Sequence, residues 1–225
     1  MTHRNVLPLS LFALTLAAGC AGPQITKAAK FPLMYEEKPR TILVLPPINS
    51  TTAADAKGYY ATTVSSPLAF SGYYVFPIEV TDDILKSQGL YDTEMIGDQP
   101  LNRFGQFFGA DAVLFTHIRK WNKSYMVISS TLTVSVDAKL KSTKTNRILW
   151  EYSGTIVADL SGNSSGGGIG GVIAGAIVTA INSATADYVP YARLANVQML
   201  QSMPVGGYHP KSGQDGDEKI LEHGR

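Results

Sequence analysis

The sequence predicts a single α/β domain built on one mixed sheet. Two patterns predict it. The segment Thr41–Leu45 is apolar after its first residue and stops at Pro46-Pro47, which is typical of a central strand buried on both faces. Residues 125–159 instead alternate between apolar and polar side chains, as antiparallel strands with one solvated face do. Segments with helical spacing lie between and after these strands, so we expect parallel and antiparallel pairing in one sheet.

The first half of the domain alternates strands with helices. Asn49 to Thr52 has the composition of a turn and a helix cap, Gly72 ends the first helix, and Leu101, Phe104 and Phe108 recur at helical spacing. Thr81-Asp82-Asp83 is expected to cap the second helix, which Gly89 ends. The expected elements are a strand over 41–45, a helix over 53–69, a strand over 73–77, and helices over 84–88 and 100–108.

The second half is expected to be a three-strand meander followed by two helices. Leu132, Val134, Val136 and Ala138 fall on one face of the middle strand, and polar residues fall on the other. The expected elements are a strand over 112–118, a turn at 121–123, a strand over 125–139, a hairpin turn at 141–146, a strand over 147–159, and helices over 172–185 and 190–201.

The amino end has the three parts of a secretory leader. Arg4 supplies a positive start, an apolar segment follows from about Val6 to Ala18, and small residues precede Cys20, the only cysteine. About 13 apolar residues are fewer than the roughly 20 that a membrane-spanning helix needs. A lone cysteine forms no intramolecular disulfide, so lipidation explains Cys20 better than plain secretion does.

The run Leu16-Ala17-Ala18-Gly19-Cys20 resembles the lipobox of bacterial lipoproteins, although that family prefers Leu where Ala17 stands. The resemblance implies that residues 1–19 are removed, that diacylglycerol joins the Cys20 sulfur, and that the new amino end is acylated, commonly with palmitate. Ala21 resembles the default signal for the outer membrane. We therefore expect a lipid anchor in the outer membrane, on its periplasmic face.

Composition and the chain ends complete the expected organisation. A formal net charge of +1, without a basic run, argues against a nucleic-acid partner. Residues 21–38 lack clear periodicity, and residues 206–225 are polar and rich in glycine. The expected divisions are a signal peptide over 1–19, a lipidated tether over 20–38, an α/β periplasmic domain over 39–204 and a flexible tail over 205–225.

The phrase Gly109-Ala110-Asp111-Ala112-Val113-Leu114 enters the third strand. Together with the element order and the leader, it resembles the small proteobacterial lipoprotein family of unknown function DUF799, over roughly residues 38–203. That family is akin in fold to the amino-terminal domain of TolB and to the curli-secretion lipoprotein CsgG. The resemblance implies a non-catalytic domain that serves secretion or envelope assembly. Its partners would be other envelope lipoproteins or a secretion channel.

Small residues recur every fourth position from Gly167 through Gly171 and Gly175. On a helix they form one narrow stripe that lets another backbone come close, so these three glycines are candidates for self-association. Packing within the domain and contact with lipid remain the alternatives. A phosphate loop is disfavoured because no Lys or Arg occurs between Arg147 and Arg193.

Catalytic residues are not apparent. Of the four histidines, His117 alone falls in the expected fold, and no nucleophile elbow or zinc-ligand spacing occurs. The sequence therefore predicts no catalytic residue, metal or cofactor. It favours a binding component of a secretion or envelope-assembly complex over two alternatives, a self-assembling scaffold or pore and an envelope hydrolase.

Four tyrosines cluster around the first helix and the second strand: Tyr59, Tyr60, Tyr73 and Tyr74. Most are expected in the core. A pair that faced outward would be a candidate surface for a protein partner, because tyrosine is enriched in interfaces.

Overall fold

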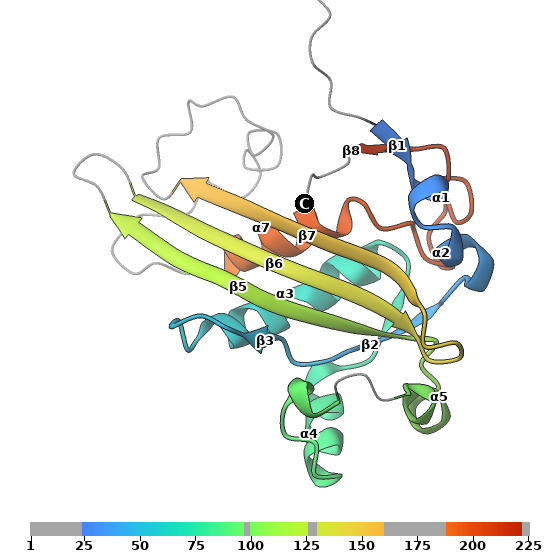
Figure 1. Cartoon of the computed structure of the whole chain (residues 1–225), viewed down its shortest axis with the longest axis horizontal. Helices are drawn as coiled ribbons and strands as arrows, with labels where there is room; N and C mark the ends of the chain where they lie inside the picture. The colour runs from blue at the N-terminus through green and yellow to red at the C-terminus, as the bar shows by residue number, and fades with distance from the viewer. Residues whose placement is uncertain (1–23, 97–99, 126–129, 160–187, 222–225) are drawn as a thin grey trace, which may run out of the picture.

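A six-stranded mixed sheet forms the centre of the protein and confirms the predicted α/β fold (Figure 1). The computed structural model describes residues 24–96, 100–125, 130–159 and 188–221. The strands lie in the order β4-β2-β5-β6-β7, and β3 pairs with β5. Their bounds are β2 Thr41–Val44, β3 Ile48–Asn49, β4 Tyr74–Val75, β5 Ala112–Tyr125, β6 Ser130–Ser142 and β7 Ile148–Asp159.

Strand β2 is the buried central strand that its apolar run predicts. It pairs in parallel with both β4 and β5, and Ile42 and Leu43 are fully buried on opposite faces. Strands β5, β6 and β7 form the expected antiparallel meander. On β6, the predicted apolar face of Leu132, Val134 and Val136 is buried.

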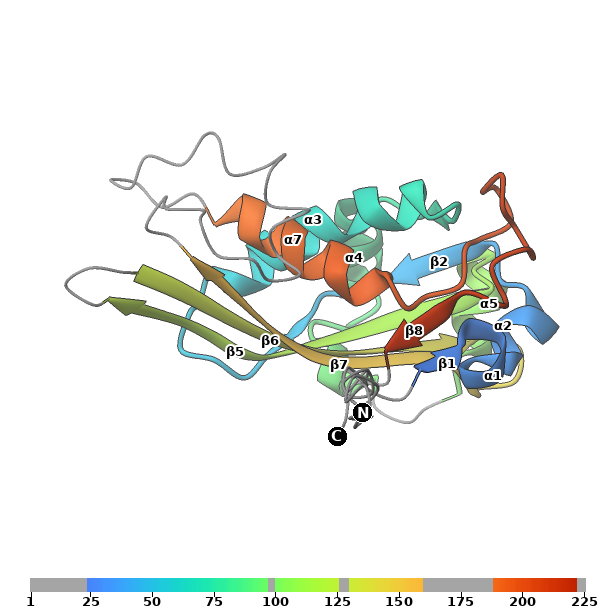
Figure 2. The same cartoon turned by 90° about the horizontal axis from the view of Figure 1, so that it is seen from above.

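Helices cover both faces of the sheet. Helix α3 (Ala56–Phe70) packs against α7 (Val189–Leu200) on the face that carries Ile42 (Figure 2). Helices α4 (Ile78–Ser87) and α5 (Asn102–Phe108), with the short 3-10 helix η1 (Thr93–Met95), cover the face that carries Leu43. None of the helices in the described ranges combines the length and the apolar composition needed to cross a bilayer.

Among the sequence-based boundaries that differ from the structure, two have a clear physical reason. Helix α4 begins at Ile78, so the expected cap at Thr81-Asp82-Asp83 lies inside the helix, where Thr81 is buried and Asp82 pairs with Lys86. Strand β5 continues to Tyr125, through the expected turn at 121–123, because Trp121 packs into the core beside Tyr59. The helix expected over 172–185 lies outside the described residues.

The expected tether and tail contain ordered structure. Strand β1 (Gln24–Thr26) pairs antiparallel with β8 (Lys219–Leu221), and α1 (Lys27–Lys30) and α2 (Pro32–Glu37) follow β1. We call residues 24–38 together with 204–221 the terminal clasp. Phe31 and Met34 of this clasp are buried in the main core. The folded unit therefore extends beyond the expected limits of 39 and 204 at both ends.

A buried ion pair joins the two halves of the terminal clasp. Lys27 Nζ donates to Asp215 Oδ2 at 3.2 Å and to Glu218 Oε2 at 2.8 Å. The side chains of Lys27 and Asp215 are only 6% and 1% exposed. The Tyr35 hydroxyl and the Val205 N–H also donate to Asp215, at 3.1 and 2.9 Å. The Asp215 carboxylate thus receives the several partners that a buried charge requires.

Candidate functional site

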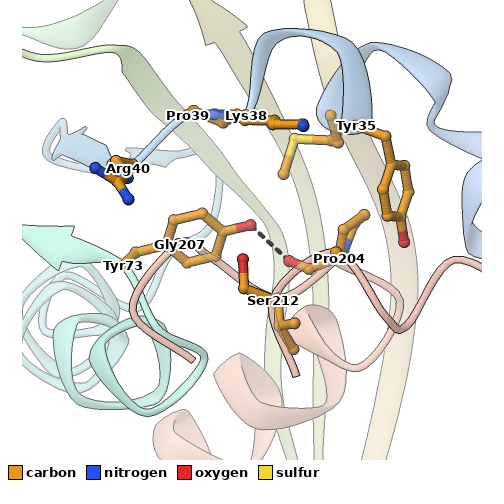
Figure 3. A pocket seen from close by; sticks show the side chains of 11 residues that line it. Tyr35, Lys38, Pro39, Arg40, Tyr73, Pro204, Gly207 and Ser212 are labelled. Carbon is orange, nitrogen blue, oxygen red and sulfur yellow. Dashed lines mark hydrogen bonds between the residues drawn. The ribbon is translucent and has the colours of Figure 1, made fainter. Parts of the chain in front are cut away.

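A surface pocket of about 200 Å³ lies between helix α2, the segment that leads into β2, and the carboxy-terminal half of the terminal clasp. Figure 3 shows Lys38 and Pro39 along one side and Pro204 and Ser212 on the facing side, with Tyr73 between them. The lining residues are Met34, Tyr35, Lys38, Pro39, Arg40, Tyr73, Pro204, Val205, Gly207, Ser212 and Gly213. Segments from both ends of the chain therefore build one pocket.

Hydrogen bonds hold two tyrosines in the wall of this pocket. The Tyr73 hydroxyl donates to the Pro204 carbonyl at 2.5 Å, and the Tyr35 hydroxyl donates to Asp215. Burial, and then the nearby Asp215 carboxylate, raise the pKa of both hydroxyls far above the ordinary value. Both tyrosines therefore stay neutral at physiological pH and act as fixed walls.

Two cationic side chains, Lys38 and Arg40, are among the residues that line the pocket. Neither Lys38 nor Arg40 forms an ion pair with another residue of the described ranges, and no lining residue is acidic. The Arg40 guanidinium lies over the Tyr208 ring, 5.6 Å from its centroid. A Cβ at Gly207 would meet Arg40 Nε at 2.8 Å, so Gly207 leaves the space that Arg40 occupies. The pocket suits a small anionic group.

The conformation of the cationic segment is also held from the sheet side. Asp111 accepts hydrogen bonds from the N–H groups of Arg40 and Thr41, at 3.0 and 3.1 Å, and from the Thr41 hydroxyl at 3.1 Å. Gly109, at φ +71°, ends α5 just before it. The Gly109–Asp111 part of the family-like phrase thus ties the start of β2 to the start of β5.

The four candidate tyrosines do not form one surface. Tyr60 and Tyr73 are buried, and Tyr60 donates to the Met199 sulfur at 3.0 Å. Tyr59 is half-buried and stacks on Trp121, with ring centroids 6.5 Å apart. Tyr74 alone is exposed, at 51%. Two of the four tyrosines are therefore core residues, a third is half-buried, and neither pair faces outward as a pair.

Tyr74 belongs instead to an aromatic surface that the sequence patterns did not suggest. Its ring meets Phe76 edge-on at 5.2 Å, Phe76 meets Phe108 at 6.2 Å, and Phe108 meets Phe107 at 4.9 Å. Phe107 is 66% exposed. We call Tyr74, Phe76, Phe107 and Phe108 the aromatic patch. Strand β4 and helix α5, about 30 residues apart in the sequence, bring it together.

Among the polar residues of the sheet, His117 makes the contact that most resembles a catalytic pair. Its Nε2 lies 2.7 Å from the Ser50 hydroxyl on the solvated face. Its cross-strand neighbour Asp137 forms an ion pair with Arg119, with Nε and Oδ2 2.7 Å apart, rather than orienting the imidazole. Within the described ranges, no cluster of three or more His, Cys, Asp or Glu residues suits a metal ion.

The remaining sequence-based candidates, Cys20, Gly167, Gly171 and Gly175, lie outside the described residues. The sequence patterns do not single out the polar residues of the pocket. Lys38 and Ser212 fall in segments whose composition indicates tether and tail, and Arg40 stands directly before the first strand. The only local signal is the pair of cations that flank Pro39.

Comparison with known proteins places the chain among bacterial lipoproteins. A family model described as "Putative lipoprotein GNA1162-like" matches residues 30–209. A protein of Neisseria meningitidis serogroup B named "Putative lipoprotein NMB1124/NMB1162" is 33% identical over 152 residues, which cover 67% of this chain and 69% of that protein.

Solved structures include a relative and a more distant likeness. The crystal structure of lipoprotein GNA1162 from N. meningitidis is 32% identical, with a TM-score of 0.51, and the match covers 62% of this chain and 96% of that one. A PelC dodecamer from Paraburkholderia phytofirmans is 14% identical, with a TM-score of 0.46, over 81% of this chain and 93% of that one. The match of the family model to residues 30–209, together with the Neisseria relative, shows that the chain belongs to the GNA1162-like family of lipoproteins, in agreement with the resemblance to DUF799.

Proposed function

We propose that this lipoprotein is anchored in the outer membrane through acylated Cys20, faces the periplasm, and acts as a non-catalytic binding component of a secretion or envelope-assembly complex. Its partner would be another envelope lipoprotein or a secretion channel. Family membership and the leader support the anchor. The aromatic patch is the observation that carries the binding role.

The aromatic patch has the chemistry of a protein interface. Tyr74 and Phe107 expose more than half of their area, and their rings connect through Phe76 and Phe108. Aromatic side chains are enriched in interface cores and supply large contact areas at a low cost in conformational entropy. Because these four side chains are uncharged, binding through them is expected to survive moderate salt, unlike charge-driven association.

A photocrosslinking amino acid at Phe107 tests the binding role in cells. We expect a discrete crosslinked product with an envelope protein. The same amino acid at Val157 is a matched control, since Val157 is 64% exposed on β7, at the opposite edge of the sheet. Crosslinks that form equally well at both positions, or at neither, would contradict a partner site at the aromatic patch.

The anchor has a separate test. Cys20→Ser removes the sulfur that would carry diacylglycerol, so the variant should stay unacylated and leave the outer-membrane fraction. Fractionation of cells and a shift in gel mobility measure both effects. An unchanged distribution and mobility would exclude lipidation at Cys20. The self-assembling alternative rests on Gly167, Gly171 and Gly175, and sedimentation of wild type against Gly171→Leu tests it.

A further inference from the structure

The proposed anchor and the terminal clasp are close in the sequence. Strand β1 begins at Gln24, four residues after Cys20. Four residues span at most about 14 Å at 3.3–3.6 Å each. If Cys20 is acylated, the clasp must therefore lie near the bilayer surface, without the long tether that the sequence predicted.

The pocket is physically joined to this end of the molecule. Lys27, which follows β1 directly, binds Asp215, and Asp215 accepts a hydrogen bond from the N–H of Val205 in the pocket wall. The pocket also takes residues from α2 and from the segment before β8. Strand β1, which follows the anchor, is thus linked through Lys27 and Asp215 to the wall of the pocket.

We propose that this pocket binds the phosphate of an anionic phospholipid headgroup in the membrane that holds the protein. The proposal rests on the anchor at Cys20, since the anchor brings the pocket to the bilayer. Binding there would fix the orientation of the domain on the membrane, a property that flexible acyl chains alone do not supply.

The residues of the pocket fit a phosphate ester. Lys38 and Arg40 provide two cations without acidic partners among the described residues, and Ser212 provides a hydroxyl on the facing wall. Arginine and lysine are the side chains that most often bind phosphate oxygens. Met34, Pro39 and Pro204 supply apolar wall for the glycerol carbons next to the phosphate. The hydrogen bond to Pro204 fixes Tyr73 in the wall, and the absence of a side chain at Gly207 leaves room for Arg40.

Vesicle binding by the mature chain tests the proposal. The chain from residue 20 onward, carrying Cys20→Ser and made without the leader, contains every described residue and no acyl group. It is sedimented with vesicles of phosphatidylcholine alone, and with vesicles of phosphatidylcholine and phosphatidylglycerol in equal amounts. We expect it to bind the vesicles that contain phosphatidylglycerol and not the others. A titration with inorganic phosphate forms a third arm.

Single substitutions assign the binding to the pocket. A basic residue near an anionic membrane contributes about a fivefold change in binding, so Lys38→Gln and Arg40→Gln should each weaken it about fivefold. Lys139→Gln removes an exposed charge from β6, away from the pocket, and should weaken binding less than about twofold. Gly207→Ala keeps all charges but displaces Arg40, and it should weaken binding as well. Thermal unfolding shows that each variant is folded.

Three results would overturn the proposal. One is wild-type binding without preference for phosphatidylglycerol. Another is equal weakening by Lys139→Gln, which would indicate a diffuse charge effect. The third is saturable binding of inorganic phosphate without vesicle binding, which would assign the pocket to a soluble phosphate. None of these results bears on acylation, because fractionation of Cys20→Ser in cells decides that point independently.

Discussion

The meander and the terminal clasp are stabilised in different ways. On β6 of the meander, Leu132, Val134 and Val136 bury alternate side chains against the helices. In the clasp, one buried carboxylate receives a lysine, a tyrosine hydroxyl and a backbone N–H. The meander spreads its stability over many similar apolar contacts, each worth about 1.5–3 kcal/mol when a side chain is fully buried. In the clasp, a few polar groups share one buried carboxylate, so the loss of any one of them leaves another buried polar group without its partner.

The largest effect is expected at the centre of the clasp. Asp215→Ala removes one of the two carboxylates that pair with the buried Lys27, and it leaves the Tyr35 hydroxyl and the Val205 N–H without their acceptor. We expect a loss of about 3–5 kcal/mol in unfolding free energy. The double variant Lys27→Met with Asp215→Ala also removes the buried ammonium group of Lys27 and should recover part of that loss. Denaturant unfolding measures both.

An exposed ion pair is the control for this substitution. Asp82→Ala removes the partner of Lys86 on α4, at i and i+4, and should leave the unfolding free energy almost unchanged because water screens the pair. If Asp215→Ala destabilised the protein no more than Asp82→Ala does, the clasp would be a detachable appendage. The meander and the terminal clasp would then differ in how strongly they are coupled to the core, and not in the kind of contact that stabilises them.

The same contrast explains which parts of the fold could be predicted from the sequence. Strand β2 and the buried face of β6 follow from patterns within about 5 to 15 residues, where apolar spacing reports directly on burial. The Lys27–Asp215 pair joins residues 188 apart in the sequence. From its neighbours alone, Lys27 has the pattern of a solvated side chain, because nothing local shows that a carboxylate will reach it.

The candidate site divides in the same way. Tyr60 lies in α3 and Tyr73 directly before β4, and the expectation that most of the four tyrosines are core residues covered the burial of both. The aromatic patch could be predicted only in part. Tyr74 was a sequence-based candidate, but Phe107 is connected to it only through the ring contacts of Phe76 and Phe108. Lys38 and Arg40 line a pocket only because residues 204–213 pack beside Tyr73, and this contact between distant segments could not be predicted from the local sequence.

An intermediate effect is expected where the clasp meets the α3–β4 turn. Gly206→Ala would place a Cβ 2.3 Å from the Gly72 carbonyl oxygen, which is backbone and cannot move aside easily. We expect a loss of about 1–3 kcal/mol, the range for overpacked sites. The backbone of residue 206 is held in this position, because the Gly206 N–H donates a hydrogen bond to the Ser71 carbonyl at 2.8 Å.

The control for Gly206 is a glycine in a helix. A Cβ added at Gly58 of α3 would have no neighbour within 4 Å among the described residues, so Gly58→Ala should stabilise the protein by about 0.5–1 kcal/mol. Calorimetry on both variants therefore gives opposite shifts in Tm. Stabilisation by both substitutions would mean that residues 204–209 do not pack on the α3–β4 turn.

The smallest effect concerns Asp111, the carboxylate that ties β2 to β5 at the start of both strands. Burial alone would raise its pKa, but hydrogen bonds from Arg40 and Thr41, with the charge of Lys144, outweigh burial and lower the pKa below the ordinary 3.8. A lowered pKa in the folded state contributes stability above about pH 4, and that contribution is lost as the pH falls through the folded value. Asp111→Asn keeps one acceptor oxygen and should cost about 1 kcal/mol at pH 7.

The acid side of this prediction separates the charge from the hydrogen bonds. Wild type should lose more unfolding free energy than Asp111→Asn between about pH 4 and pH 2, because only the wild-type carboxylate is protonated there. Urea unfolding at a series of pH values measures the difference. Asp83→Asn, which removes an exposed carboxylate of α4, controls for net charge at pH 7. Parallel acid curves for wild type and Asp111→Asn would show that neutral hydrogen bonding suffices at this junction, and that the sheet, unlike the clasp, needs no charge to hold its strands together.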